Sequence, residues 1–103
     1  MTFSIIAKES AGDGDARRFG VGATTNNPGI GVFCPAVSTR GAVATQYQTY
    51  GEVGPQILGY LDDGLRAEDA VPATLNASEA ASMLQVHAIG EESTAVHHGE
   101  DLV

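Results

Sequence analysis

The chain has 103 residues, enough for one small domain that spans residues 1–103. Its 43% hydrophobic and 17% charged residues are typical of a globular protein and exclude the composition of a disordered chain. Thirteen acidic residues against five basic ones give a formal net charge of -8. This charge repels phosphate backbones and anionic lipids, so we expect neither nucleic acid nor a membrane as a partner.

Two expected strands open the chain. Residues 2–8 are apolar and β-branched, and the turn-forming residues 10–15 follow them. Residues 18–24 are the expected hairpin partner, with apolar side chains on one face and two glycines on the other. The glycine face is a bare backbone surface that another segment can approach closely.

The middle of the chain contains a loop signal at residues 26–29 and a short apolar segment at 32–37 that Pro35 interrupts. We assign no structure to that segment. Residues 42–47 are small and apolar, which predicts a third strand buried on both faces.

After residue 54 the apolar residues recur at the spacing of a helix, which predicts helices over about 55–63 and 67–76. Pro72 lies inside the second helix, where its missing backbone donor should shorten or kink it. Two further apolar runs, 83–89 and 93–98, flank a turn and predict a second hairpin. The expected order is two strands, one strand, two helices and two strands.

The cysteine and the three histidines predict no metal site and no cofactor. Cys34 is the one cysteine of the chain and lies in an apolar context, which favours a buried structural thiol and no internal disulfide. His87 alternates with apolar residues and is expected to be half-buried with a hydrogen-bond partner. Strand alternation sends His97 and His98 to opposite faces, so at most one of them joins any single site.

The start of the chain also bears on the cellular compartment of the protein. No basic-then-apolar signal peptide precedes the first strand, and no apolar run reaches the roughly 18 residues of a membrane span. We therefore expect a soluble cytoplasmic protein.

Thr2 is the first candidate for chemistry. Removal of Met1, which is expected when residue two is small, would expose a free α-amine beside the Thr2 hydroxyl. An α-amine with a reference pKa of about 7.7–8.0 can accept the hydroxyl proton at neutral pH and so activate its own nucleophile. The alternative is that threonine is simply a common second residue.

Several stretches form an ordered series along the chain. They are MTFSIIA at the start, FGVGA at 19–23, GAVATQ at 41–46, DGLRAEDA at 63–70, LQV at 84–86 and AVHHGE at 95–100. The series resembles the N-terminal half of the DUF1028 family, a largely uncharacterised group assigned to the N-terminal-nucleophile (Ntn) hydrolase superfamily. The resemblance covers essentially the whole chain, but only the first half of a usual family member.

The resemblance implies an α+β fold, namely half of an αββα sandwich in which an antiparallel sheet carries two helices on one face. It also implies that Thr2 is the catalytic nucleophile, with its α-amine moving the proton and neighbouring donors holding the oxyanion. Ser4 is a second hydroxyl, which by alternation shares the Thr2 face of the strand. Thr45 and Gln46 are expected to line the site because their strand is expected to border the first.

The leading interpretation is an Ntn amidohydrolase, or the N-terminal part of one, that hydrolyses C–N bonds in a small amide or peptide-like substrate. The alternative is a non-catalytic oligomerising or ligand-binding module that retains the first half of the family fold. Half a sandwich would expose apolar sheet surface, so we expect a homo-oligomer or a complementing chain to cover it.

Overall fold

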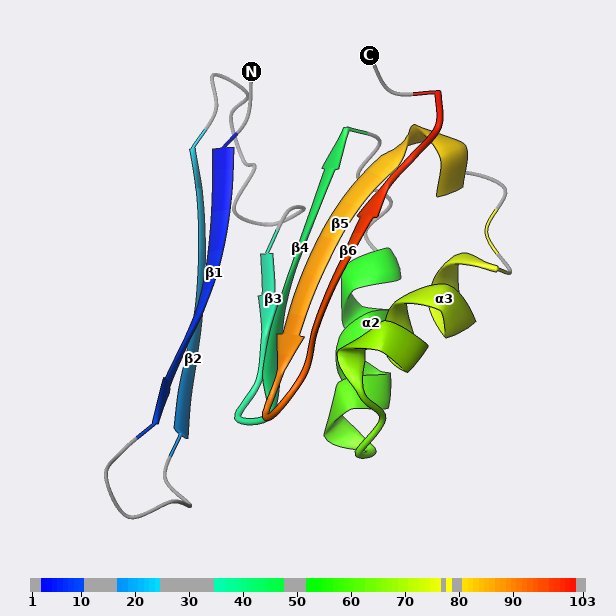
Figure 1. Cartoon of the computed structure of the whole chain (residues 1–103). Coiled ribbons are helices and arrows are strands. Elements are labelled where there is room, and N and C mark those ends of the chain that lie inside the picture. Colours follow the sequence, from blue (N-terminus) through cyan, green and yellow to red (C-terminus); the bar gives the residue numbers. More distant parts are fainter. Residues whose placement is uncertain are drawn as a thin grey trace.

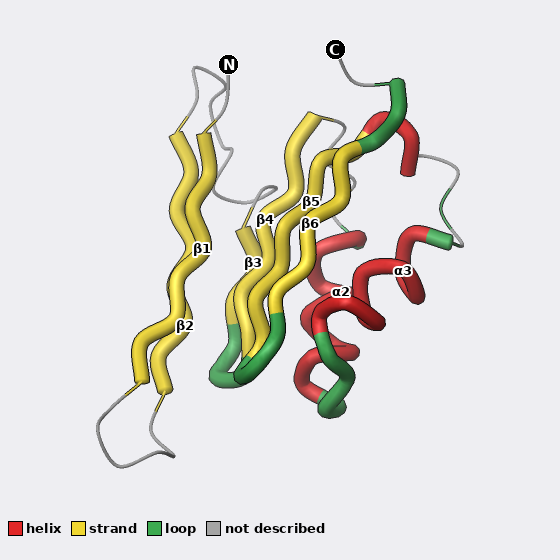
Figure 2. Tube along the Cα trace, in the orientation of Figure 1, coloured by secondary structure: helices red, strands yellow, loops and turns green. Residues whose placement is uncertain are grey.

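A computed structural model describes residues 3–10, 17–24, 35–47, 52–76, 78 and 81–101. They form three layers, with a two-stranded sheet, a four-stranded sheet and a pair of helices stacked in that order (Figures 1 and 2). The strands are β1 (Phe3–Ser10), β2 (Arg17–Thr24), β3 (Pro35–Val37), β4 (Gly41–Tyr47), β5 (Leu84–Gly90) and β6 (Thr94–His98). The helical elements are α2 (Val53–Asp62), α3 (Ala67–Leu75) and the short 3-10 turn η1 (Ala81–Met83).

Both sheets are antiparallel. β1 pairs with β2 in one sheet, and β3, β4, β5 and β6 follow one another in the other. The helices α2 and α3 lie on one face of the larger sheet (Figure 2). The predicted α+β class, with antiparallel strands and two helices on one face, is therefore confirmed.

Two prolines, Pro35 and Pro72, lie inside regular secondary structure. The segment to which no structure was assigned contains β3, and Pro35 is the first residue of this edge strand, a position that tolerates a missing backbone donor. Helix α3 continues past Pro72 to Leu75, with the Asn76 amide donating to the Pro72 carbonyl. The expected shortening at Pro72 is therefore wrong, because the buried face of α3 packs on the sheet on both sides of the proline.

The second hairpin has the predicted form. β5 pairs with β6, and the Gly90 amide donates to the Ser93 carbonyl at 2.8 Å across the turn. Helix α2 ends close to its predicted stop, where Gly64 has a φ of 96°, a backbone conformation that favours glycine.

The hydrophobic core lies between the larger sheet and the helices. Ile57 is fully buried, and side chains from β4, β5, α2 and α3 pack around it. The core side chains are Val43, Val53, Ile57, Leu61, Ala67, Ala70, Val71, Leu75, Leu84, Val86 and Ala88. One face of β4 and β5 is therefore occupied by the helices, and the opposite face is left for β1 and β2.

The inner face of the first hairpin is joined to the larger sheet at two points. Ser4 and Lys8 project from the same face of β1, because side chains alternate along a strand. Ser4 contacts His87 and Gln46, and Lys8 donates to the backbone carbonyl of Glu91 at 2.6 Å. These contacts orient the start of β1 relative to β4 and β5.

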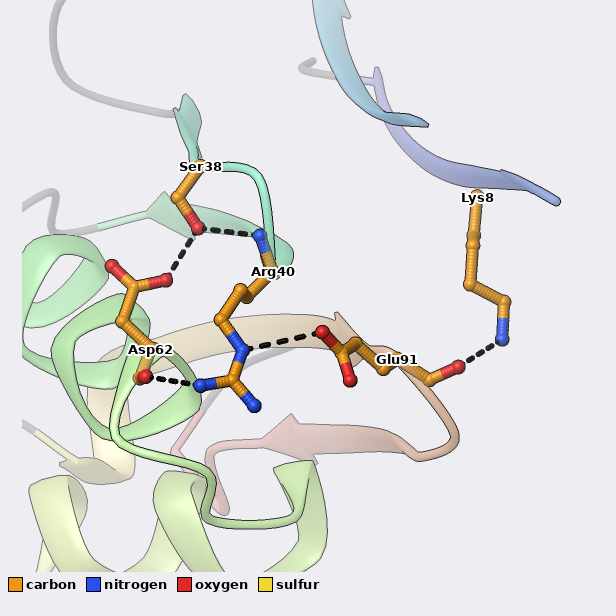
Figure 3. A network of polar contacts seen from close by, with 5 residues as sticks. All are labelled: Lys8, Ser38, Arg40, Asp62 and Glu91. Atoms are coloured by element: carbon orange, nitrogen blue, oxygen red, sulfur yellow. Dashed lines mark hydrogen bonds and ion pairs between the residues drawn. The ribbon is translucent and has the colours of Figure 1, made fainter. Parts of the chain in front are cut away.

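The Lys8 contact belongs to a polar network that Figure 3 shows from close by. The Arg40 Nε donates to Glu91 Oε1 at 3.2 Å, and its Nη1 donates to the Asp62 carbonyl at 2.7 Å. Ser38 Oγ donates to Asp62 Oδ1 at 2.6 Å and accepts from the Arg40 amide. The network thus connects the first hairpin, the β3–β4 turn, the end of α2 and the β5–β6 turn.

The outer face of the first hairpin is apolar and open. Phe3 is 65% exposed and Ile5 is 68% exposed, and both alternate with the inward-facing Ser4. Gly22 lies opposite Ile5 on this outer face, and the alternation of β2 that separates its glycines from its apolar side chains is as predicted. The register therefore places a flat apolar surface on the side of the hairpin that faces away from the larger sheet.

Candidate functional site

The candidate site lies between the two sheets, next to the first described residues of β1. A cavity of about 320 Å³ opens there. Its described lining residues are Phe3, Ser4, Gln46, Gln85, Val86, His87 and Val96. They come from β1, β4, β5 and β6, so the site exists only when the hairpin packs on the larger sheet.

Strand alternation explains which side chains reach the cavity. Gln46 is paired with Gln85 in the β4–β5 ladder, and His87 is paired with Val96 in the β5–β6 ladder. These residues share the face of the sheet opposite the helices, because the buried positions of β5 alternate with them. The polar groups of the site therefore stand on the face that β1 approaches.

Three of these side chains are joined by hydrogen bonds. Ser4 Oγ lies 2.8 Å from His87 Nε2, and the Gln46 amide nitrogen donates to Ser4 Oγ at 2.5 Å. The hydroxyl of β1 is thereby held between an amide of β4 and an imidazole of β5.

His87 is half-buried and hydrogen-bonded, as its alternating context predicted. Burial lowers the pKa of its imidazole below the ordinary value of 6.5. The neutral ring therefore predominates at neutral pH, and a neutral imidazole has one ring nitrogen that accepts a hydrogen bond. The sequence signalled a satisfied histidine but not its partner, which is 83 residues away.

The predicted site residues separate into three groups. Ser4 and Gln46 are brought together in the cavity. Thr45 is 1% exposed and alternates with Gln46, so it shares the helix-facing side of β4 with Val43 and does not line this cavity. Thr2, the predicted nucleophile, lies outside the described residues.

The chemistry of the described lining is polar but uncharged. The hydroxyl of Ser4, the carboxamides of Gln46 and Gln85 and the neutral imidazole of His87 lie on the same side of the sheet as the Val96 side chain. Within the ranges that the structure describes, no three His, Cys, Asp or Glu side chains gather into a group that could hold a metal ion. Such a lining suits an uncharged group that both donates and accepts hydrogen bonds, with an apolar part against Val96.

The other histidines lie elsewhere. His97 Nε2 is 2.7 Å from the Ala81 carbonyl on the helix side of β6, and His98 is exposed on the opposite face. The predicted separation of this pair is confirmed. Cys34 lies outside the described residues. None of the described helices is long and apolar enough to cross a membrane.

A solved structure has the same fold. It is the crystal structure of a DUF1028 protein from Silicibacter pomeroyi, which is 23% identical and superimposes with a TM-score of 0.81. The match covers 97% of this chain and 44% of that one, so the chain spans less than half the length of this relative. No curated protein matches the chain.

The sequence itself settles the family. The model of the family of unknown function DUF1028 matches residues 2–103, which include every strand and helix of the three layers. The chain belongs to the DUF1028 family.

Proposed function

We propose that this protein is an N-terminal-nucleophile amidohydrolase, or the N-terminal part of one, with Thr2 as its nucleophile. The cavity between the sheets supports this proposal most directly. Thr2 immediately precedes Phe3, which lines that cavity at the start of β1. Phe3 and Ser4, the two residues that follow Thr2 in the sequence, both belong to the lining of this polar, uncharged cavity.

The proposed reaction needs a free N-terminus. The Thr2 hydroxyl oxygen attacks an amide carbonyl carbon, and the α-amine takes the hydroxyl proton. The C–N bond then breaks, the leaving amine takes up that proton, and the acyl group remains as an ester on Thr2. Water, deprotonated by the α-amine, hydrolyses this ester and restores the hydroxyl.

The cavity lining is consistent with a small amide or peptide-like substrate. The carboxamides of Gln46 and Gln85 supply N–H donors and carbonyl acceptors, which are the complements of an amide group. None of the described lining residues is Asp, Glu, Lys or Arg, so a charged acyl group would lose its hydration without gaining a charged partner there.

The alternative is a ligand-binding or oligomerising module without turnover. Its supporting observation is the pair of exposed apolar side chains, Phe3 and Ile5, on the outer face of the hairpin. In either case we propose that a second copy or a complementing chain covers this apolar face. The two proposals differ in whether a covalent acyl-enzyme forms.

Labelling of the purified protein with a β-lactone distinguishes these functions. Intact mass first shows whether Met1 has been removed, and we expect the processed protein to gain one acyl adduct. Thr2→Ala should abolish the adduct, whereas Thr24→Ala, a matched change on the adjacent strand, should leave it intact. Retention of Met1, or an adduct that persists in Thr2→Ala, would contradict Thr2 as the nucleophile.

A further inference from the structure

Ser4 is a second hydroxyl in the cavity, and the fold supplies the base that its own sequence neighbourhood lacks. A serine hydroxyl is a weak nucleophile unless a base within about 2.6–3.2 Å takes its proton. The distance of 2.8 Å from Ser4 Oγ to His87 Nε2 lies within this range. No free N-terminus is required for this pair, because both groups are side chains.

The hydrogen-bond directions favour proton transfer from serine to histidine. The nitrogen of the Gln46 carboxamide carries only donors, so Ser4 Oγ accepts that bond. An oxygen that accepts from an amide is better able to carry developing negative charge. In the tautomer that carries its proton on Nδ1, His87 Nε2 accepts the hydroxyl hydrogen of Ser4.

The surroundings also keep His87 in its reactive form. Of the described titratable side chains on the strands packed against it, His98 on β6 and Lys8 on β1 share its side, whereas His97 on β6 and Glu9 on β1 lie on the opposite faces of their strands. Lys8 is directed to the Glu91 carbonyl, and Glu9 pairs with Arg18. Neither carboxylate nor ammonium therefore contacts the imidazole, whose pKa is lowered by burial alone.

We propose that Ser4 and His87 form a second nucleophile–base pair in this cavity, which acts on uncharged esters and activated acyl groups. Ser4 Oγ bonds to the carbonyl carbon while its proton passes to His87 Nε2. The alcohol leaving group departs with that proton, and the acyl group stays on Ser4. Water, deprotonated by Nε2, then cleaves the acyl–Ser4 bond, releases the acid and returns the proton to Ser4.

A fluorophosphonate probe tests this pair directly, because its phosphorus bonds to an activated serine oxygen and expels fluoride. We expect one adduct on the full chain, mapped to Ser4 by peptide mass spectrometry. Ser4→Ala should abolish the adduct, and the control Ser38→Ala, which changes a serine outside the cavity, should not. Absence of an adduct in the unsubstituted protein, or an adduct on another residue, would overturn the proposal.

The role of His87 has its own test. We expect His87→Gln, which keeps a hydrogen-bonding side chain, to slow labelling about 100- to 10,000-fold, the usual contribution of a general base. Labelling should also slow as the pH falls through the lowered pKa of His87, and His98→Gln should leave that profile unchanged. Labelling that His87→Gln does not slow, in a variant that retains its circular dichroism and melting profile, would overturn the assignment.

This inference and the proposed function fail separately. Thr2→Ala should abolish the β-lactone adduct but retain the fluorophosphonate adduct on Ser4. Ser4→Ala should abolish the fluorophosphonate adduct but retain the β-lactone adduct on Thr2. A fluorophosphonate adduct that maps to Thr2 would support the N-terminal nucleophile and overturn the Ser4–His87 pair.

Discussion

Ser4 and His87 share a 2.8 Å contact across 83 residues of sequence. Lys8 and Glu91 have the same sequence separation, and their contact lies four residues further along β1. The constant separation shows that β1 runs in the same direction as β5 across the gap between the sheets. Sliding β1 by one residue would therefore turn Ser4 away from the cavity and break both contacts.

The pH dependence of stability should report the state of His87. Its folded pKa is below the ordinary 6.5, so the unfolded chain binds a proton more readily than the folded one between these two values. The free energy of unfolding should therefore fall as the pH drops through about 6.5, until the folded-state pKa is passed. Chemical denaturation at several pH values measures this decrease. In His87→Gln the free energy of unfolding should fall less over the same pH range.

The exposed His98 provides the control for that experiment. His98→Gln should keep the pH dependence of the unsubstituted protein. If His87→Gln and His98→Gln follow the same curve as the unsubstituted chain, the imidazole of His87 does not titrate differently on folding.

Gly99 should be one of the least replaceable positions at the end of β6. A Cβ added there would lie 2.2 Å from the Ser82 carbonyl oxygen, which belongs to the backbone and cannot move aside as a side chain can. We expect Gly99→Ala to lower the free energy of unfolding by about 1–3 kcal/mol or more, as overpacking does. Gly59→Ala is the matched control, because nothing lies within 4 Å of the added atom.

Gly59 lies inside helix α2, where alanine is the better helix former. Gly59→Ala should raise the free energy of unfolding by about 0.5–1 kcal/mol. Urea denaturation of both variants measures the two effects. Equal and small changes in the two variants would mean that the backbone near Ser82 yields to the new methyl group.

Arg40 should contribute to stability as a connector of three turns. Its Nε and Nη1 groups bind Glu91 and the Asp62 carbonyl, as Figure 3 shows. Both side chains of the Arg40–Glu91 pair are nearly half exposed, so solvent screening limits the gain to about 1 kcal/mol. We expect Arg40→Ala to lower the free energy of unfolding, measured by urea denaturation, by about that amount. Arg40→Lys should restore only part of it, since lysine lacks the planar guanidinium group.

Arg66 is the control for Arg40. Arg66 pairs with Glu68 two residues along the chain, both side chains are exposed, and its link to the β5–β6 turn is a long 3.4 Å bond from Nη2 to the Glu92 carbonyl. Arg66→Ala should therefore change stability less than Arg40→Ala does. A larger loss at Arg66 would show that the connections made by Arg40 carry little of the folding free energy.

The apolar outer face of the hairpin should mediate association. Ile5 is 68% exposed on this face, beside Phe3. If a second copy covers it, sedimentation of the unsubstituted chain should show a species larger than the monomer, and Ile5→Lys should shift it toward the monomer. Leu65→Lys, at a side chain that is 38% exposed beyond α2, is the control and should leave the association unchanged.

A single sedimenting species of monomer mass would contradict self-association. In that case a complementing chain remains the proposed cover, and mixing experiments with Ile5→Lys would test it. Loss of that complementation in Ile5→Lys but not in Leu65→Lys would place the contact on the hairpin.

Much of the local structure could be predicted from the sequence. The alternation of residues 18–24 predicted the glycine face of β2, and the turn residues after Ile89 predicted the hairpin of β5 and β6. The local rule for proline wrongly predicts that α3 is cut short at Pro72, because the buried face of this helix packs on a sheet. Short-range patterns indicate which segments are strands or helices, but packing decides whether an unfavourable residue is tolerated.

The candidate site was only partly predictable. Strand alternation predicts Ser4 on the Thr2 face of its strand, and the expected border between two strands predicts Gln46 at the site; the structure brings these two side chains together. The same expected border predicts Thr45, but strand alternation assigns it to the opposite face of β4. A one-residue difference in position is enough to move a side chain from the cavity to the core.

The sequence by itself determined the α+β composition, the two hairpins, the family and the uncharged character of the candidate lining residues. Only the tertiary structure decided that the first hairpin packs as a separate layer, and that Ser4 meets His87 and Gln46. Local backbone preferences act over a few residues, whereas the pairing of sheet faces depends on which apolar surfaces are buried together. A contact across 83 residues is therefore a property of the folded layers, not of any motif in the chain.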